Sequence, residues 1–248
     1  MKMNIFRRSI ELRCRQTPQG WEARAALEDD FHHFRVMVRC AAEQVQSVAG
    51  ETIRHPYSLC PGAAGQLAQL AGMKLDCVAH SVTRVADATQ QCTHMLELAG
   101  LAIALVARRD ERRSYRIAVP RRVQENTVAT LARNSVPMLT WHVAQDYITA
   151  PAPYAGVPLR AGMARWALQA LEPENAEAAL VLRRAVVISR GREIDQDARA
   201  HAEANSTCFV QQPARAPLAR RMVGSTWDFT STPDALCALD ARWLAWQS

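Results

Sequence analysis

The most apolar stretch of the chain is residues 92–106, with the sequence CTHMLELAGLAIALV. Only Glu97 and Gly100 interrupt the apolar residues after His94, and a helix that is apolar on all sides has to be covered on most of them. The stretch is shorter than the roughly 20 apolar residues that a membrane-spanning helix needs. It therefore predicts a central, buried helix, which we expect Thr89 to cap through its hydroxyl.

A second helix is predicted to begin at the motif Cys60-Pro61-Gly62-Ala63. Proline suits the first helical position because the N–H that it lacks is not needed there. Cys60 would then be the N-cap residue, a position that lowers the pKa of a thiol and favours the thiolate. Gly72 is expected to end this helix.

Three motifs in this region resemble the signature of a bacterial family known only as a domain of unknown function. They are Cys-Pro-Gly-Ala at 60–63, Leu-x-Gly-x-x-Leu at 70–75 and Cys-Thr-His-Met at 92–95. The resemblance is clearest over residues 50–107 and is expected to extend to the N-terminal strands and to residues 183–229. Members of the family often occur in bacteria that degrade aromatic compounds, so the resemblance implies that context and no defined activity.

Residues 5–53 alternate between apolar and other side chains, which is typical of strands with one face on the core. The short connections predict four antiparallel strands in a meander. The expected later elements are a helix over 73–88, a strand over 108–122, a polar helix over 120–137, a strand over 139–148, and helices over 161–171, from Pro173, over 195–204 and from Pro233. The fold class is therefore predicted to be α+β, with an N-terminal antiparallel sheet packed on a central buried helix and a mixed α/β second half. The expected boundary separates residues 1–120 from 121–248, and both parts can belong to one domain.

The composition excludes some classes of partner. The net charge of +6 results from 30 basic and 24 acidic residues, and among the basic residues only Lys2 and Lys74 are lysine. No basic block alternates with aromatic residues, so no nucleic-acid partner is predicted. No apolar segment typical of a signal peptide follows the basic N-terminus, and no membrane span is predicted. Seven scattered cysteines without a Cys-x-x-Cys pair argue against a disulfide framework and predict a cytoplasmic location.

The sharpest chemical hypothesis joins Cys60, Cys92 and His94. If the two helix starts converge, His94 can act as a general base and one thiol as a nucleophile or polar pocket residue. Glu97 follows His94 by three residues on the same helix face and is expected to orient the ring. Cysteine and histidine at helix starts are commonly structural, so the alternative is that all of them are core side chains.

Two adjacent histidines, His32 and His33, open the third strand and should point to opposite faces. His32 is expected to face inward, as a core side chain or as an acid/base near Asp30, and His33 to face outward. The sequence lacks a metal-ligand spacing such as His-x-x-x-His, so no metal ligands are predicted. A haem remains open as a cofactor, with a lone histidine such as His33, His94 or His142 as its axial ligand and the apolar central helix against the ring.

Together these patterns predict a cytoplasmic enzyme that acts on a small organic acid or aromatic catabolite, free or as a coenzyme A thioester. The arginines of residues 108–122 can hold a carboxylate or the phosphates of coenzyme A, although a solvated edge strand is the alternative. Two other functions stay open: a haem-binding protein or oxygenase, and a non-catalytic ligand-binding or accessory protein. A homodimer formed through a sheet edge is a further possibility.

Overall fold

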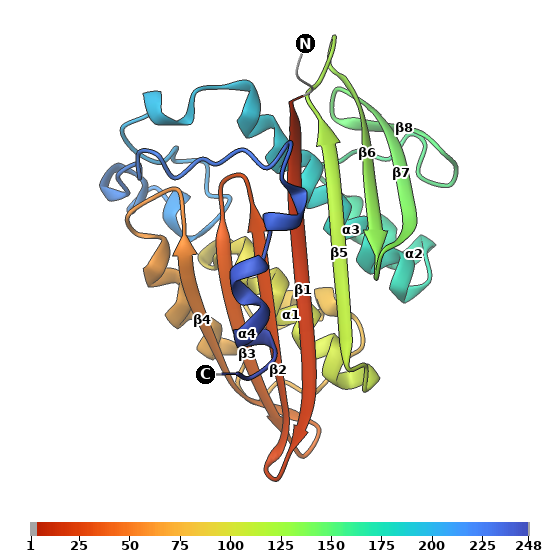
Figure 1. The fold of residues 1–248 in the computed structure, drawn as a ribbon, viewed down its shortest axis with the longest axis vertical. Coiled ribbons are helices and arrows are strands. Elements are labelled where there is room, and N and C mark those ends of the chain that lie inside the picture. Colours follow the sequence, from red (N-terminus) through yellow and green to blue (C-terminus); the bar gives the residue numbers. More distant parts are fainter. Residues whose placement is uncertain (1–3, 248) are drawn as a thin grey trace.

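The computed structural model describes residues 4–247, which form an eight-stranded antiparallel sheet with most of its helices on one face (Figure 1). The strands lie side by side in the order β4-β3-β2-β1-β5-β6-β7-β8. Their bounds are β1 Ile5–Thr17, β2 Gly20–Asp29, β3 His33–Ala41, β4 Gln44–Arg54, β5 Arg112–Pro120, β6 Asn126–Arg133, β7 Val136–Ala144 and β8 Tyr147–Ala150. The α+β class and the N-terminal antiparallel sheet are confirmed.

The sheet consists of two meanders that meet between β1 and β5. The four strands of the first meander follow the predicted alternation, so Ile10 and Leu12 of β1 are buried against the core. The second meander continues the same sheet, because β5 pairs with β1 on one side and with β6 on the other. One hydrophobic cluster therefore contains residues from both sides of position 120, such as Ile10 and Trp141.

The central helix α1, Thr93–Arg108, lies across β1, β2 and β3. Met95 and Leu98 on this helix are completely buried, which agrees with the predicted central position. The N-cap residue is Cys92. The prediction of Thr89 as the cap was wrong, because Thr89 belongs to a separate short 3-10 turn that ends before an extended residue.

Helix α3 (Pro173–Ser189) covers the second meander, and α2 (Met163–Ala170) packs on α3. Glu177 of α3 is buried and accepts hydrogen bonds from Arg108 at the end of α1 at 3.2 Å and from Arg113 of β5 at 2.9 Å. The hydroxyl of Tyr115 also donates to Glu177. This carboxylate of α3 thus links α3 to α1 and β5, since both of those elements contribute hydrogen-bond donors to it.

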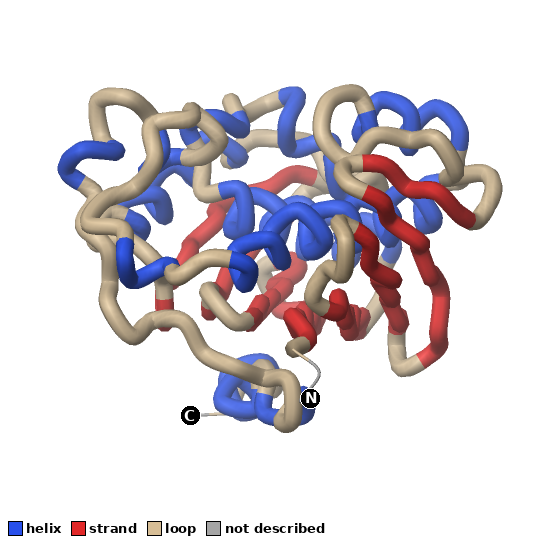
Figure 2. Tube along the Cα trace, turned by 90° about the horizontal axis from the view of Figure 1, so that it is seen from above, coloured by secondary structure: helices blue, strands red, loops and turns tan. Residues whose placement is uncertain are grey.

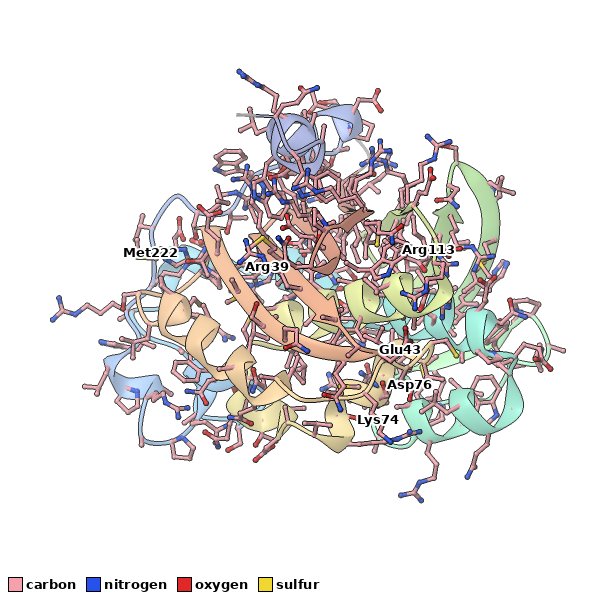
Figure 3. All side chains as sticks on the ribbon, turned by 90° about the horizontal axis from the view of Figure 1, so that it is seen from below. Arg39, Glu43, Lys74, Asp76, Arg113 and Met222 are labelled. Carbon is pink, nitrogen blue, oxygen red and sulfur yellow. The ribbon has the colours of Figure 1, made fainter. Side chains whose placement is uncertain are left out.

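The C-terminal segment lies on the opposite face of the sheet, apart from the other helices (Figure 2, Figure 3). Its short helix α4, Ala241–Leu244, follows Asp240. One carboxylate oxygen of Asp240 lies 2.8 Å from Nε2 of His33, and the other accepts from Nε of Arg35 at 2.5 Å. His33 therefore points away from α1, yet it is buried because the C-terminal segment covers it.

The remaining helices are 3-10 helices. They are η1 Cys60–Leu70, η2 Ala79–Arg84, η3 Ala88–Gln90, η4 Arg190–Glu193, η5 Gln196–Ala198, η6 Phe209–Gln211, η7 Ala216–Leu218, η8 Pro233–Ala235 and η9 Ala238–Asp240. The N-cap residue of η1 is Leu59, so the prediction that Cys60 caps this helix was wrong by one position. Gly72 follows the end of η1 with a positive φ of 83°, a conformation that suits glycine.

Four predicted helices are absent, shortened or divided among residues 4–247. Residues 120–137 contain strand β6, in which Thr127, Ala129 and Leu131 face the core in alternation. Residues 195–204 contain only the three-residue η5, and residues 73–88 contain η2 and the first residue of η3. The helix predicted from Pro233 is divided into η8, η9 and α4.

Candidate functional site

A cavity of about 330 Å³ lies where the start of α1, the loop after β2, η1 and the end of α3 approach one another. Four of the predicted site residues line it, namely His32, Cys60, Cys92 and His94. The two helix starts therefore converge as the hypothesis required. A neighbouring cavity of about 280 Å³ shares four of its lining residues, Thr93, Arg183, Arg184 and Thr207, and is also lined by Glu97 and Glu177.

Behind the cavity wall Asp29 holds His32 in a fixed orientation. Asp29 ends β2 and is completely buried. Its Oδ1 accepts from the backbone N–H groups of Phe31 at 2.8 Å and His32 at 2.9 Å, and lies 3.0 Å from Nδ1 of His32. Its Oδ2 accepts from Nε of Arg8 at 2.9 Å and from Nη2 of Arg8 at 2.5 Å. Burial alone would raise the pKa of Asp29, but His32 and Arg8 hold it below its usual range.

His94, in the first turn of α1, faces His32 with 4.0 Å between the ring centroids. Its Nε2 is buried and has no hydrogen-bond partner among the residues that the structure describes. Burial lowers the pKa of His94 well below its usual value, and the nearby charges of His32 and Arg8 lower it further. His94 is therefore a neutral imidazole with a free nitrogen. One ligand atom each of Asp29, His32 and His94 lies within 4.8 Å of the others.

The role predicted for Glu97 was wrong. Instead of orienting His94, its Oε1 lies 3.0 Å from Nε of Arg184 and its Oε2 lies 3.8 Å from Nη1 of Arg8. Both arginines come from other elements, α3 and β1, so the spacing within α1 could not reveal them. The one acid in the apolar helix thus takes part in a buried charge network that runs from Arg184 through Arg8 to Asp29.

The thiols are not activated as predicted. Burial raises the pKa of Cys92 to about 11 and the pKa of Cys60 well above its usual range. Cys208 joins them at the cavity, and burial raises its pKa as well. A position at a helix start favours the thiolate only where water or a cation also reaches the sulfur, and here desolvation dominates. At neutral pH these cysteines are protonated side chains of the cavity wall.

We expect a thiol-reactive probe such as iodoacetamide to label Cys77 at pH 7 and to leave Cys60 and Cys92 unmodified in the folded protein. Cys77 is exposed, whereas the other two are buried and stay protonated. Labelling of Cys92 should rise only as the pH approaches its pKa of about 11. Peptide mass spectrometry measures each site, and Cys77→Ser is the control. Fast modification of Cys60 or Cys92 at pH 7 would refute the protonated state.

The cavity is lined by four arginines and by no aspartate or glutamate of the described chain. Arg184 pairs with Glu97, Arg199 with Glu203 at 3.2 Å and Arg221 with Asp197 at 2.9 Å. Arg183 donates to two main-chain carbonyls, of Leu159 at 2.6 Å and of Arg160 at 3.1 Å. Among residues 4–247, no acidic side chain lies within an ion-pair distance of its charge.

The arginines of residues 108–122, which were expected to grip an anion, do not line this cavity. Arg113 pairs with Glu177, Arg116 with Glu11 and Arg122 with Glu193. The four cavity arginines come from α3 and the later loops, where no local pattern marks them as a group. Only the spacing Asp29-x-x-His32 could have pointed to Asp29, which sequence reasoning missed.

Of the three histidines considered as haem ligands, His94 lines the cavity, whereas His33 and His142 do not. His33 is buried under the C-terminal segment, between Glu28 and Asp240. His142 is exposed on β7, opposite Val128 of β6. Neither residue lines the cavity of His94, so the geometry does not favour a haem between them.

Residues 6–107 match a family described as Protein of unknown function (DUF2889). The match confirms the resemblance over the N-terminal strands and the two motif-bearing segments, while residues 183–229 lie outside it. No curated protein and no solved structure matches the chain. In the described part of the chain, no helix has the length and apolar character needed to cross a membrane.

Proposed function

We propose that the protein is an enzyme that binds a small organic anion in the cavity between α1 and α3, with His32 and His94 as the groups that face it. The observation that carries the proposal is a cavity with four arginines and no carboxylate in its lining, beside a pair of histidines. Guanidinium groups bind carboxylates by charge-assisted hydrogen bonds. Such bonds are stronger in a site that is partly shielded from water.

The other walls of the cavity indicate what the anion carries. Phe31, Phe34 and Tyr57 form one side, and Val187 and Ile188 of α3 form another. The adjoining cavity adds leucine side chains from α1 and α3 beyond the shared arginines. Ligand sites that combine apolar walls with a few polar groups select molecules of the same character. We therefore infer an aromatic or aliphatic carboxylate with its apolar body toward the second cavity.

The orientation of His32 supports a catalytic rather than a purely binding role. Asp29 contacts Nδ1 of His32 and leaves Nε2 available, an arrangement that fixes the tautomer and direction of an imidazole. The cytoplasmic location, the coenzyme A thioester and dimerisation through the edge strands β4 or β8 remain predictions.

The proposal is tested by calorimetric titration with benzoate, cinnamate and octanoate, each compared with its neutral amide. We expect at least one carboxylate to bind and its amide to bind about tenfold more weakly or worse, because a hydrogen bond to a charged group contributes about 1.5–3 kcal/mol. Arg183→Gln should weaken the same carboxylate about tenfold or more. Arg165→Gln, at an exposed position outside the cavity, is the matched control.

Two outcomes would count against this function. Equal binding of a carboxylate and its amide would show that the arginines do not recognise the anion. Carboxylate binding that Arg183→Gln leaves unchanged would place the ligand elsewhere. Binding with no turnover in wild-type protein, for any ligand of the series and its esters, would favour the non-catalytic alternative.

A further inference from the structure

We propose that Asp29, His32 and His94 hold a divalent transition-metal ion of the zinc or iron(II) type at the wall of the cavity. The inference deepens the proposed function, and rests on it for the identity of the cavity as the reaction site. The spacing of these residues in the sequence does not indicate a metal site, because His94 lies in a different element from Asp29 and His32. The fold brings one carboxylate and two imidazoles to within 4.8 Å.

The unpartnered nitrogen of His94 is the first argument for a bound ion. His94 is 8% exposed, and its Nε2 is buried without a hydrogen-bond partner in the described chain, residues 4–247. Buried polar atoms in folded proteins are nearly always satisfied, and an exception needs an explanation such as an ion. A neutral imidazole nitrogen is the donor that zinc, iron and related metals accept.

The position of Asp29 is the second argument. Its Oδ1 lies 3.0 Å from Nδ1 of His32. Neighbouring ligands of a tetrahedral zinc lie about 3.3–3.6 Å apart, given metal–ligand bonds of about 2.0–2.2 Å. A cation between these two atoms would therefore take the place of the proton that they share, with little movement of either residue.

Surrounding contacts orient the carboxylate in the way that metal sites require. Arg8 holds Oδ2 of Asp29 through two N–H groups, and the backbone N–H groups of Phe31 and His32 donate to Oδ1. Outer contacts of this kind fix the direction of a ligand and are needed for affinity. Arg8 is completely buried, so this support is rigid.

The charge balance connects the metal to the organic anion. Arg8 already neutralises Asp29, so a divalent ion would leave the site positive apart from Glu97, 3.8 Å from Arg8. Two histidines and one carboxylate leave further coordination positions open. The cavity beside His32 and His94 contains no acid of the described chain. An anionic substrate or a water-derived hydroxide is therefore the ligand that would complete the shell and balance the charge.

The test measures metal binding alone, without any organic ligand. Protein stripped with a chelator is titrated with Zn²⁺ and, under anaerobic conditions, with Fe²⁺ by calorimetry, and Co²⁺ is followed by its visible absorption. We expect one equivalent to bind. Since even outer contacts of metal sites are worth about 10–100-fold in affinity, His94→Ala should weaken binding about 100-fold or more.

His32→Gln and Asp29→Asn are the second and third ligand variants, and His201→Ala is the control at an exposed histidine outside the cavity. Circular dichroism checks that each variant folds. No metal binding by wild-type protein, or equal binding by wild type and a folded His94→Ala variant, would overturn the proposal. If metal-free protein still binds a carboxylate such as benzoate, the proposed function stands even though the metal proposal fails. If the protein binds the metal but no carboxylate, the proposed function is refuted instead.

Discussion

Replacing Arg8 with alanine is expected to destabilise the protein by about 3–5 kcal/mol, the cost of removing one partner from a buried ion pair. The side chains of Arg8 and Asp29 are completely buried, and two hydrogen bonds join them. Without the guanidinium group, Asp29 would remain in the interior with only His32 and two backbone N–H groups to stabilise its charge. Glu97 would also lose its contact with Arg8.

Urea unfolding of wild type and variant measures this difference in stability. Arg116→Ala serves as the control, because Arg116 is 44% exposed and pairs with Glu11 at 3.0 Å at the surface. Exposed pairs of this kind contribute about 0–1 kcal/mol. If Arg8→Ala cost no more than Arg116→Ala, the buried network would not support the site as described.

Gly100→Ala is the second substitution with a large expected effect. We expect it to destabilise the protein, although replacing glycine by alanine within a helix usually stabilises one. Alanine in a helix interior is normally more favourable than glycine by about 1 kcal/mol. A Cβ atom at Gly100, however, would lie 2.1 Å from the main-chain oxygen of Ala79. Because the obstacle is backbone, α1 and η2 would have to separate, and such overpacking costs about 1–3 kcal/mol or more.

The matched control for this change is Gly65→Ala in η1. A Cβ atom at Gly65 would meet nothing within 4 Å, so alanine there should be neutral or stabilise the protein by up to about 1 kcal/mol. Thermal unfolding of both variants gives the comparison. A Gly100→Ala variant as stable as wild type would show that η2 does not pack on α1 as closely as described.

The first half of the fold could be predicted because its signals are local. Each strand of the first meander is at least nine residues long, every second residue of β3 from Phe34 to Cys40 is buried, and α1 has no polar face. The second meander was partly missed because β6 turns only small or moderate side chains toward the core, Thr127, Ala129 and Leu131. Among polar neighbours these residues resemble an exposed helix. The covering of the sheet by the C-terminal segment was missed because it depends on Asp240 reaching His33.

In the candidate site, too, some residues could be predicted from local sequence signals and others could not. His94, Cys60 and Cys92 stand out because their motifs mark the starts of helices, and the structure places them on one cavity. Their chemistry could not be read from position alone, since burial raises the thiol pKa values against the effect expected of a helix start. Asp29, Arg8 and the arginines of α3 come from distant parts of the chain. Only the folded chain brings them to the histidines.

The central claim is that the cavity between α1 and α3 binds an organic anion beside His32 and His94. A crystal structure of the complex with the tightest-binding carboxylate of the titration series tests this most directly. We predict that the carboxylate accepts hydrogen bonds from Arg183 or Arg184 and that the apolar body lies toward the neighbouring cavity. A carboxylate bound on another face of the protein, with this cavity empty, would contradict the account.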